Sequence, residues 1–366
     1  MSKPTFTVSK DSLESAIRIV SRAVSPKSTL PVLEFIRFDM PDNETLRLSA
    51  TDLTKSITVK IPAKINQMLG VCLPAKTIVE FIGTLSSGEL EMTIDERTMV
   101  AKIVSGSSKS SIKGITTVEF PNVSPFKGQT INLSDSFWAL VSRVAVAASG
   151  DEARPILTGI FIKGEDKTLT VSAADGFRLA RAHVLTDSDE KYSVIIPASA
   201  IRELVKVIKG DCKMTISTNA VLFESENVSF ASQLIDGNYP DVDQIIPESF
   251  PVCVTVASNE LKTAVRRAMI FSREEKSYAS LLVSSSNNML TVKGQAEETG
   301  ETLSDIEATV TGDDVKASFN VKYLSEGVDV FGAGDIKIQL ESDTSPGMFS
   351  RDDDPVIYLM MPMNVD

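Results

Sequence analysis

The sequence predicts an α+β protein made of three tandem domains of similar fold, each with two helices packed on sheet. Three observations predict this architecture. Short motifs recur at a spacing of about 123 residues, the length of 366 residues is three times 122, and each third shows the same order of strand and helix patterns. Such a repeat is too long for a solenoid unit of about 20 to 50 residues and suits a domain with its own core.

The repeated motifs keep their order as well as their spacing. Thr29–Leu33 recurs as Arg154–Leu157, Ala50–Asp52 as Ala173–Asp175, and Leu73–Ala75 as Ile196–Ala198, at separations of 124, 123 and 123 residues. A fourth pair, Phe120–Val123 and Tyr239–Val242, is separated by 119 residues, and Phe319–Val321 marks a degenerate third copy. We therefore expect domains at residues 1–127, 128–252 and 253–366.

The first repeat opens with a strand over residues 5–8, followed by a helix with one apolar face. Its apolar positions, spaced three and four apart, are Leu13, Ala16, Ile17, Val20 and Val24. Alternating apolar residues then predict strands over 46–50 and 57–61. A second helix is expected over 74–85, where Pro74 suits a helix start. Further strands should run to Phe120.

The second and third repeats show the same order of patterns. Helices are expected over residues 134–149 and 197–209 in the second repeat, and over 258–271 and 320–331 in the third. Each helix follows a strand pattern, as in the first repeat. The three thirds are therefore expected to share one fold.

The composition is that of a folded globular protein, with 42% apolar and 23% charged residues. Met1–Thr5 lead into a strand pattern rather than a signal peptide, and no apolar stretch approaches the roughly 18 residues of a membrane span. Cys72, Cys212 and Cys253 are odd in number and lie in apolar or strand-like segments, which favours reduced, buried thiols. We expect a cytoplasmic protein without membrane contact.

Residues that could carry catalysis are scarce. His183 is the single histidine and is expected to make a surface hydrogen bond. Acid–base or nucleophilic catalysis by histidine therefore has almost no candidate residue. The sequence has no Gly-rich phosphate loop, no His-Glu-x-x-His and no Cys-x-x-Cys spacing. We predict no catalytic residue, no metal site and no cofactor.

The acidic residues that could suggest a metal site have a structural explanation. Asp52 and Asp175 occupy equivalent places in two repeats, which is typical of turn residues that bond their own backbone. Asp352–Asp354 is expected to form a solvated turn before the last strand.

Positive charge is concentrated on one helix of each repeat, although the net charge of the chain is −12. On these helices the cations lie three or four residues apart, on a polar face opposite the apolar face. They are Arg18, Arg22 and Lys27 in the first repeat, Arg202, Lys206 and Lys209 in the second, and Lys262 and Arg266 in the third. Recurrence in three repeats leaves two readings open, a shared phosphate-binding function and three ordinary solvated faces.

An ordered set of motifs over the whole chain closely resembles the bacterial DNA polymerase III beta subunit family, the beta sliding clamps. The set comprises Thr29–Leu33, Ala50–Leu53, Arg154–Gly159, Ala174–Ala180, Asp236–Asp241 and Tyr358–Met363. The resemblance implies a head-to-tail homodimeric ring of six domains with the DNA clamp fold, helices lining the channel and sheets outside. It implies no reaction; the ring encircles double-stranded DNA of any sequence and confers processivity on the replicative DNA polymerase.

The resemblance also implies the sites. Arg154 would join the basic helix residues in the channel. Short clamp-binding peptides of the polymerase, the clamp loader and other partners would enter an apolar pocket between the second and third domains. By motif the pocket is Leu157, Ala174, Gly176, Phe177, Arg178, Leu179, Pro247, Val252, Leu359, Met361, Pro362 and Met363. Some members have threonine at Ala174 and histidine at Phe177, and the tail Asn364–Asp366 departs further.

The ring contact implied by the resemblance joins the first domain of one copy to the third domain of the next. Its residues would be Lys109, Ser110 and Ile112 on one side, and Ile270, Phe271, Glu297, Glu298 and Glu301 on the other. Ser110 stands where some members have an aromatic residue, which predicts a smaller apolar centre.

Two alternatives to the clamp reading remain open from the residues alone. One is an enzyme that uses carboxylates or a metal without histidine, and a strongly shifted acid in a cleft would favour it. The other is a repeat-domain interaction protein, such as an array of β-rich domains.

Overall fold

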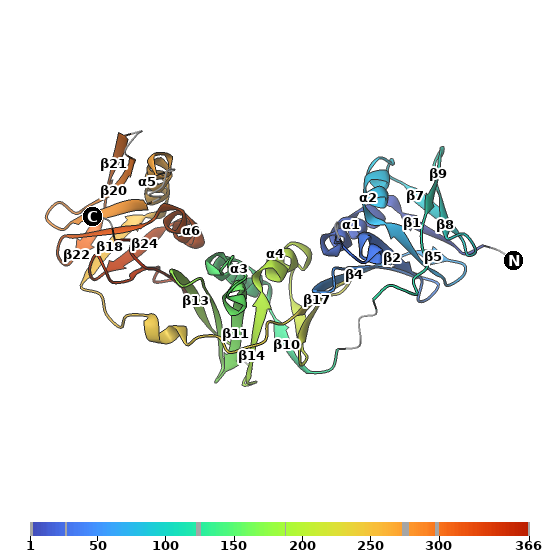
Figure 1. Ribbon diagram of the computed structural model, residues 1–366, viewed down its shortest axis with the longest axis horizontal. Helices are drawn as coiled ribbons and strands as arrows, with labels where there is room; N and C mark the ends of the chain where they lie inside the picture. The colour runs from blue at the N-terminus through green and yellow to red at the C-terminus, as the bar shows by residue number, and fades with distance from the viewer. Residues whose placement is uncertain are drawn as a thin grey trace. The chain divides into compact units, whose positions relative to one another are not determined.

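The computed structural model describes residues 3–25, 28–121, 126–186, 188–272, 278–296 and 300–364 (Figure 1). By their contacts these residues form two compact units. Unit 1 contains the chain up to Asp135 together with Arg202–Leu234, and unit 2 contains Ser136–Ile201 together with Ile235–Asp366. Each unit holds one large and one small antiparallel sheet, so strands from distant parts of the sequence share a sheet.

Unit 1 contains a small and a large sheet. The small sheet has the order β5 (Lys64–Ile65), β1 (Thr5–Ser9), β7 (Glu89–Asp95), β8 (Val100–Ser105), β9 (Ser108–Lys113). The large sheet has the order β10 (Gln129–Leu133), β15 (Cys212–Ile216), β16 (Ala220–Glu224), β17 (Val228–Gln233), β4 (Lys55–Pro62), β3 (Thr45–Thr51), β2 (Phe35–Asp39), β6 (Gly70–Pro74). Alternate residues of these strands are buried, for example Leu46, Leu48 and Ala50 of β3, as a strand with one face on the core requires.

Unit 2 has the same composition of one large and one small sheet. The large sheet has the order β14 (Tyr192–Pro197), β11 (Gly159–Glu165), β12 (Thr168–Ala174), β13 (Arg178–Leu185), β26 (Val356–Met360), β25 (Gly347–Ser350), β24 (Asp335–Leu340), β18 (Val252–Ala257), β22 (Thr309–Thr311). The small sheet has the order β21 (Gly300–Glu307), β20 (Met289–Ala296), β19 (Tyr278–Ser284), β23 (Val315–Asn320).

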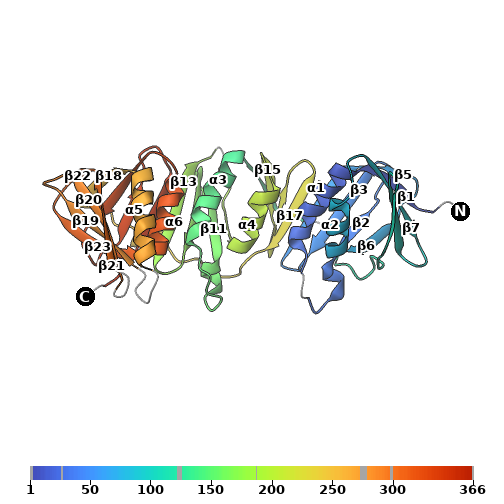
Figure 2. The same ribbon diagram turned by 90° about the horizontal axis from the view of Figure 1, so that it is seen from above.

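The helices lie in the regions that the apolar periodicity predicts, although the helix expected over 134–149 ends at Val144, where a 3₁₀ turn over Ala145–Ala147 follows. They are α1 (Lys10–Val20), α2 (Ala75–Gly83), α3 (Asp135–Val144), α4 (Ala198–Val207), α5 (Ser258–Phe271) and α6 (Val321–Phe331). In unit 1, α1 packs on β3, β4 and α2; in unit 2, α5 packs on β20, β21 and α6 (Figure 2). The fold prediction of helices packed on sheet is confirmed. Within the described residues no helix is both long and apolar enough to cross a membrane.

The first helix ends earlier than its apolar pattern predicts. We expected Val24 to continue the helical face, but α1 ends at Val20 and a short 3₁₀ turn covers Ser21–Ala23. The hydroxyl of Ser21 donates to the carbonyl of Arg18 at 2.9 Å, and Val24 adopts an extended backbone with φ −76° and ψ 138°. A side-chain hydrogen bond of this kind competes with the helical ladder and favours its end.

Two strand pairings join successive repeats, and we call them the first and second internal seams. In the first seam β4 pairs with β17, so that Ile57 faces Phe230. In the second, β13 pairs with β26, so that Ala180 faces Tyr358. The motif that equates Asp52 with Asp175 also equates Ile57 with Ala180. Both aromatic side chains are fully buried, which makes them the apolar centres of their seams.

The second seam also contains a buried ion-pair network. Arg178 donates to Asp175 at 2.9 Å and to Tyr358 Oη at 3.1 Å, and it also pairs with Glu326. Its guanidinium carbon lies 4.1 Å from the ring centroid of Tyr323. The side chains of Arg178 and Asp175 are only 7% and 8% exposed. Buried charges of this kind are tolerated only when each has its partners.

We expect Arg178→Ala to lower the free energy of unfolding by about 3 to 5 kcal/mol, because it leaves the buried Asp175 carboxylate without its counter-ion. Urea unfolding followed by circular dichroism measures the loss. Arg154→Ala is the matched control, since Arg154 pairs with Asp151 at the same sequence spacing but both side chains are nearly half exposed. The control should lose about 1 kcal/mol or less. Equal losses in the two variants would contradict the assignment of a structural role to the Arg178 network.

Candidate DNA, peptide and subunit-contact surfaces

The two repeated aspartates act as turn residues, as predicted. Asp52 Oδ1 accepts from the backbone N–H groups of Thr54 and Lys55 at 2.9 and 2.8 Å. Asp175 Oδ1 accepts from Phe177 and Arg178 at 2.9 and 3.0 Å. Each aspartate also pairs with the cation three residues later. The equivalence of the two repeats therefore extends to the hydrogen bonds of this turn.

The predicted basic surface of unit 1 lies on exposed faces of α1 and α4. Arg18 is exposed but bonds Glu14 at 2.6 Å. Arg22 and Lys206 share Glu203, at 3.0 and 2.7 Å. Lys209 donates to the carbonyl of Val205 at 3.0 Å. The cations thus reach solvent while carboxylates neutralise part of their charge.

Three exposed arginines in the described part of α4 and α5 have no assigned ion pair. They are Arg202 and Arg266, on the predicted polar faces, and Arg267. Lys262 of α5 pairs with Asp329 of α6. Arg154 bonds Asp151 at 3.0 Å. Lys27 lies outside the described residues.

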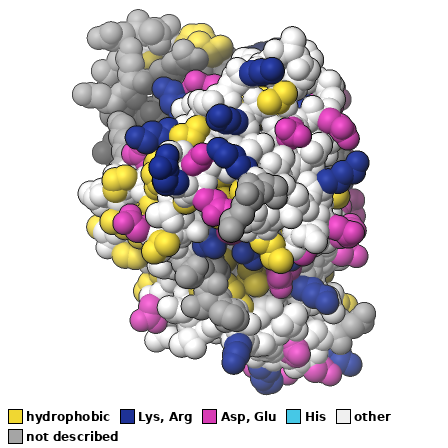
Figure 3. Space-filling model, turned by 90° about the vertical axis from the view of Figure 1, so that its right-hand side faces the viewer, with side chains coloured by type: hydrophobic (Ala, Val, Ile, Leu, Met, Phe, Trp, Pro, Cys, Tyr) yellow, Lys and Arg dark blue, Asp and Glu magenta, His cyan; other side chains and the backbone are white. Residues whose placement is uncertain are grey.

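Figure 3 views the molecule from the right-hand side of Figure 1, where the small sheet of unit 1 lies. On this face Lys and Arg side chains are interspersed with Asp and Glu side chains and with isolated apolar ones.

The ion-paired cations of α1 and α4 can attract phosphate only weakly and without sequence preference, because part of their charge is already balanced.

Three of the predicted pocket residues, Ala174, Leu179 and Leu359, belong to an apolar cluster at the second seam. Its buried members are Ala174, Leu179, Val242 and Leu359, and Tyr239, Ile246, Met348 and Ile357 pack against them. Leu179 and Leu359 face each other across the seam, and Met361 N–H donates to the Phe177 carbonyl at 2.8 Å. The structure therefore brings the Ala174–Leu179 and Leu359–Met361 segments together.

The predicted pocket residues differ in their exposure. Phe177, Met361 and Met363 are 60%, 45% and 37% exposed, whereas Leu179, Leu359 and Val252 are at most 3% exposed. Gly176 is exposed, and Leu157, Pro247 and Pro362 are half-buried. The predicted pocket set thus contains both exposed and buried apolar side chains.

Two members of this apolar cluster were not predicted from the sequence. Tyr239, whose ring stacks on Phe161 at 5.1 Å between centroids, and Val242 belong to the cluster. Burial raises the pKa of the Tyr239 phenol to about 12. The repeated motif that pairs Tyr239–Val242 with Phe120–Val123 was the available signal, because Phe120 belongs to an equivalent cluster with Val32, Leu33 and Cys72.

The predicted subunit-contact residues lie on or beside edge strands. β9, with Lys109, Ser110 and Ile112, is the edge of the small sheet of unit 1, and β21 is the edge of the small sheet of unit 2. Lys109 is exposed, Ser110 is half-buried and Ile112 is buried. Edge strands carry unpaired backbone groups that can pair with another chain.

On the other side of this contact, Ile270 of α5 is 58% exposed and Phe271 is half-buried. Glu301 Oε2 bonds Lys293 at 2.9 Å and remains half exposed. Glu297 and Glu298 lie outside the described residues.

The remaining sequence expectations concern single residues. His183 Nδ1 lies 2.9 Å from Thr170 Oγ1, which confirms its hydrogen-bonding role, and burial with the nearby Arg181 lowers the pKa of the imidazole. All three cysteines are free, and burial raises the pKa of the Cys72 and Cys212 thiols to about 12. Cys253 is only half-buried, because β18 exposes that side of the strand to solvent.

The expectation of a fully solvated acidic turn at Asp352–Asp354 was wrong for its last residue. Asp352 and Asp353 are exposed and pair with Lys337 and Arg351. The Asp354 side chain is only 13% exposed; it pairs with Arg143 of α3 and accepts from Val356 N–H at 2.9 Å. The half-buried Arg143 draws this carboxylate out of solvent.

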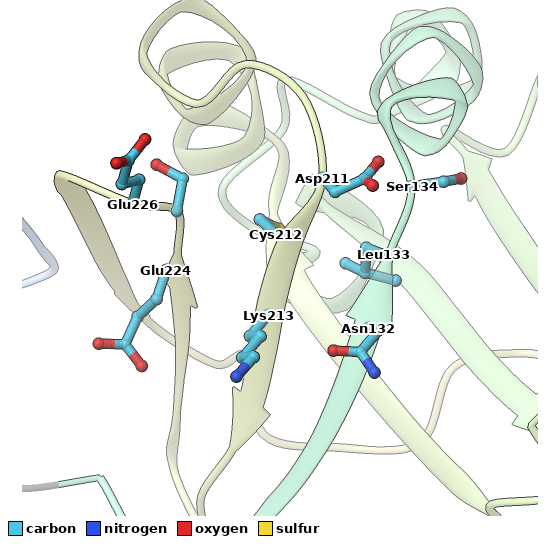
Figure 4. A pocket seen from close by; sticks show the side chains of 9 residues that line it. Asn132, Leu133, Ser134, Asp211, Cys212, Lys213, Glu224 and Glu226 are labelled. Carbon is cyan, nitrogen blue, oxygen red and sulfur yellow. The ribbon is translucent and has the colours of Figure 1, made fainter.

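An open hollow of about 690 Å³ lies on the large sheet of unit 1 (Figure 4). Asn132, Lys213 and Glu224 come from the adjacent strands β10, β15 and β16, and Asp211 and Glu226 stand at the rim. No predicted site residue lines it. In the described ranges no group of three or more His, Cys, Asp or Glu residues is arranged to hold a metal ion.

Comparison with known proteins identifies the family. Models of the N-terminal, central and C-terminal domains of the DNA polymerase III beta subunit match residues 4–124, 132–241 and 243–364. The beta sliding clamp of Staphylococcus epidermidis is 28% identical over 98% of both chains. That of Synechocystis sp. is 29% identical, over 96% of this chain and 97% of the relative.

The fold agrees with solved structures of the same family. The DNA polymerase sliding clamp of Bacillus subtilis superposes with a TM-score of 0.94 at 26% identity, covering 100% of both chains. The DNA polymerase III beta chain of Streptococcus pneumoniae gives a TM-score of 0.94 at 25% identity, covering 99% of this chain and 100% of the other. Since the three domain models match nearly the whole length in order, the chain belongs to the DNA polymerase III beta subunit family, the beta sliding clamps, which are processivity factors and not enzymes.

Proposed function

We propose that two copies of this chain close head to tail into a ring around duplex DNA and hold the replicative polymerase on its template. The observation that carries this proposal is the equivalence of the two internal seams. β4, β13 and β21 occupy equivalent places in the three repeats, and so do β17, β26 and β9. Two of each set pair within the chain, which leaves β21 and β9 for the next copy.

The domain boundaries at residues 1–127, 128–252 and 253–366 are part of the proposal. The ranges of the three family models, 4–124, 132–241 and 243–364, support them approximately. The middle domain on this division contributes β10 and β15–β17 to unit 1 and β11–β14 to unit 2. Its strands are therefore shared between the two large sheets, which is what a linking domain requires.

The DNA-facing residues proposed are the cations of α1, α4 and α5 together with Lys27 and Arg154. Their partial neutralisation by Glu14, Glu203 and Asp329 supports a sliding role. Strong phosphate contacts would hold the ring in one place, whereas weak contacts to the backbone alone permit movement along any sequence.

We expect the protein to remain on nicked circular DNA and to leave after linearisation, because a ring is retained by topology and not by adhesion. Gel filtration of the DNA fraction at about physiological salt measures retention. Arg202→Glu with Arg266→Glu should reduce binding to the circle several-fold, since both arginines are exposed and form no ion pair with another described residue.

The control for that experiment is Arg97→Glu with Lys316→Glu. Arg97 and Lys316 are exposed cations outside the helices, and the pair changes the net charge by the same amount. The control should bind the circle like wild type. Equal retention on linear and circular DNA would rule out the ring, and an equal defect in both double variants would rule out the assigned channel.

The proposed partner site is the apolar pocket at the second seam. Phe177, Met361 and Met363 are exposed and offer apolar contact to a short peptide. Methionine side chains adapt to different ligands, which suits one site that serves the polymerase, the clamp loader and other proteins. The proposal places these events in the cytoplasm, where replication proteins of bacteria work.

Peptides with a Gln followed by spaced Leu and Phe should bind this pocket with roughly micromolar affinity. The free energy gained by burying two apolar side chains exceeds the entropic cost of ordering a flexible peptide only modestly. Phe177→Ala and Met363→Ala should each weaken binding about tenfold in calorimetric titration. Leu179→Ala should also weaken binding, because it removes buried apolar volume from the cluster at the second seam.

Leu185→Ala provides the control, because Leu185 lies at the far end of the same strand and is 87% exposed. It should bind the peptide like wild type. Wild-type affinity in both Phe177→Ala and Met363→Ala would place the pocket elsewhere.

A further inference from the structure

The third seam, between copies, can be derived residue by residue from the two internal seams. In each repeat a row of paired residues crosses four strands and ends at the seam. The rows are Phe6–Met92–Ile103–Ser110, Ile131–Met214–Phe223–Phe230 and Val254–Ile338–Phe349–Tyr358. All members except Ser110 are at most 5% exposed. Ser110 thus holds the place of Phe230 and Tyr358.

The opposite strand of the third seam is fixed in the same way. Thr302 pairs with Gly294, Gly294 with Ala279, and Ala279 with Phe319. The sequence repeat equates Phe319 with Leu73 and Ile196, which pair with Ile36 and Ile160. Continuing the β2–β3 and β11–β12 registers by one residue places Ala50 and Ala173 next in these rows, and these two residues pair with Ile57 and Ala180. Thr302 therefore holds the place of Ile57 and Ala180.

We propose that the contact between copies keeps the register of the internal seams, with Ser110 of one copy facing Thr302 of the next, but lacks their aromatic centre. This inference rests on the proposed head-to-tail dimer. The same register sets Ser108 opposite Ser304, where the internal seams have Val228 opposite Val59 and Val356 opposite Ala182. Small hydroxyl side chains replace the apolar row, so the seam between copies is the weakest of the ring.

Charge and exposed apolar surface indicate a second copy as the occupant of these edges. The register places Lys109 diagonally across from Glu301 and Asp305, within reach of a long side chain. Ile270 and Leu303, beside and on β21, are both 58% exposed. In the part of the chain that the structure describes, these edges have no strand partner of their own. A weak apolar centre with complementary charges predicts a dimer that salt loosens.

The register is tested by cross-linking Ser110→Cys with Thr302→Cys in a Cys253→Ser background. Directly opposed residues in an antiparallel pair are about 4.5 to 5.5 Å apart at Cα, which suits a disulfide. Mild oxidation should convert most of the protein to a covalent dimer. The native Cys72 and Cys212 thiols are buried, with pKa values of about 12, and should not compete. Ser110→Cys with Leu303→Cys is the control, because a one-residue shift points the side chains to opposite faces.

Three outcomes are distinguishable when the native mass is measured beside the cross-link. A covalent dimer with the first pair and not with the control supports the proposal. A dimeric mass without a cross-link overturns the register while leaving the dimer intact. A monomeric mass for the wild type at every concentration overturns the dimer itself.

The missing aromatic centre is tested by Ser110→Phe. This substitution restores the side chain found in the first seam and should lower the dimer dissociation constant by about tenfold or more, measured by analytical ultracentrifugation. Ser111→Phe is the control, since Ser111 is exposed on the other face of β9 and should leave the constant unchanged. An unchanged constant in Ser110→Phe, or an equal gain in the control, contradicts the proposal.

Discussion

The structure depends on the pairing of sheet edges between successive repeats. A strand edge presents unsatisfied backbone N–H and C=O groups, and a repeat with an edge strand at each end must cover both. This chain covers two pairs internally, with β4 on β17 and β13 on β26, in one conserved register. A tandem of three such repeats leaves one strand edge of each kind unpaired within the chain. The backbone hydrogen bonds of these two edges, and not a catalytic geometry, therefore determine how copies of the chain assemble.

The seams differ in how they are held, although their backbone pairing is equivalent. The second seam adds the buried network of Arg178, Asp175 and Glu326, while the first has the more exposed pair of Lys55 and Asp52. The proposed third seam has Gly300 at the place of Lys55 and Arg178, so it lacks this ion pair as well as the aromatic centre. The proposed ring has two strong seams within each chain and one weaker seam between chains, which suits a ring that has to open and close.

The net positive charge of the helix faces is also limited. A chain with a net charge of −12 places its cations on helices, yet acidic neighbours such as Glu14 and Glu203 balance many of them. In the proposed function, contacts of this strength are adequate because retention on DNA comes from closure of the ring. The proposed peptide site is an apolar surface at the second seam, since a partner peptide needs a defined surface.

The sequence by itself determined the repeat, the helices and the family. The 3.6-residue periodicity of Leu13, Ala16 and Ile17 reports directly on burial, and the recurrence of Asp52 as Asp175 reports on a local turn that each segment forms alone. Tertiary structure decided what depends on residues far apart in the chain. The ion pair of Asp354 with Arg143 and the sharing of Glu203 by Arg22 and Lys206 involve partners that no periodicity displays. The burial of Leu179 against Leu359 was equally invisible, because strand alternation assigns faces but does not say which face another segment covers.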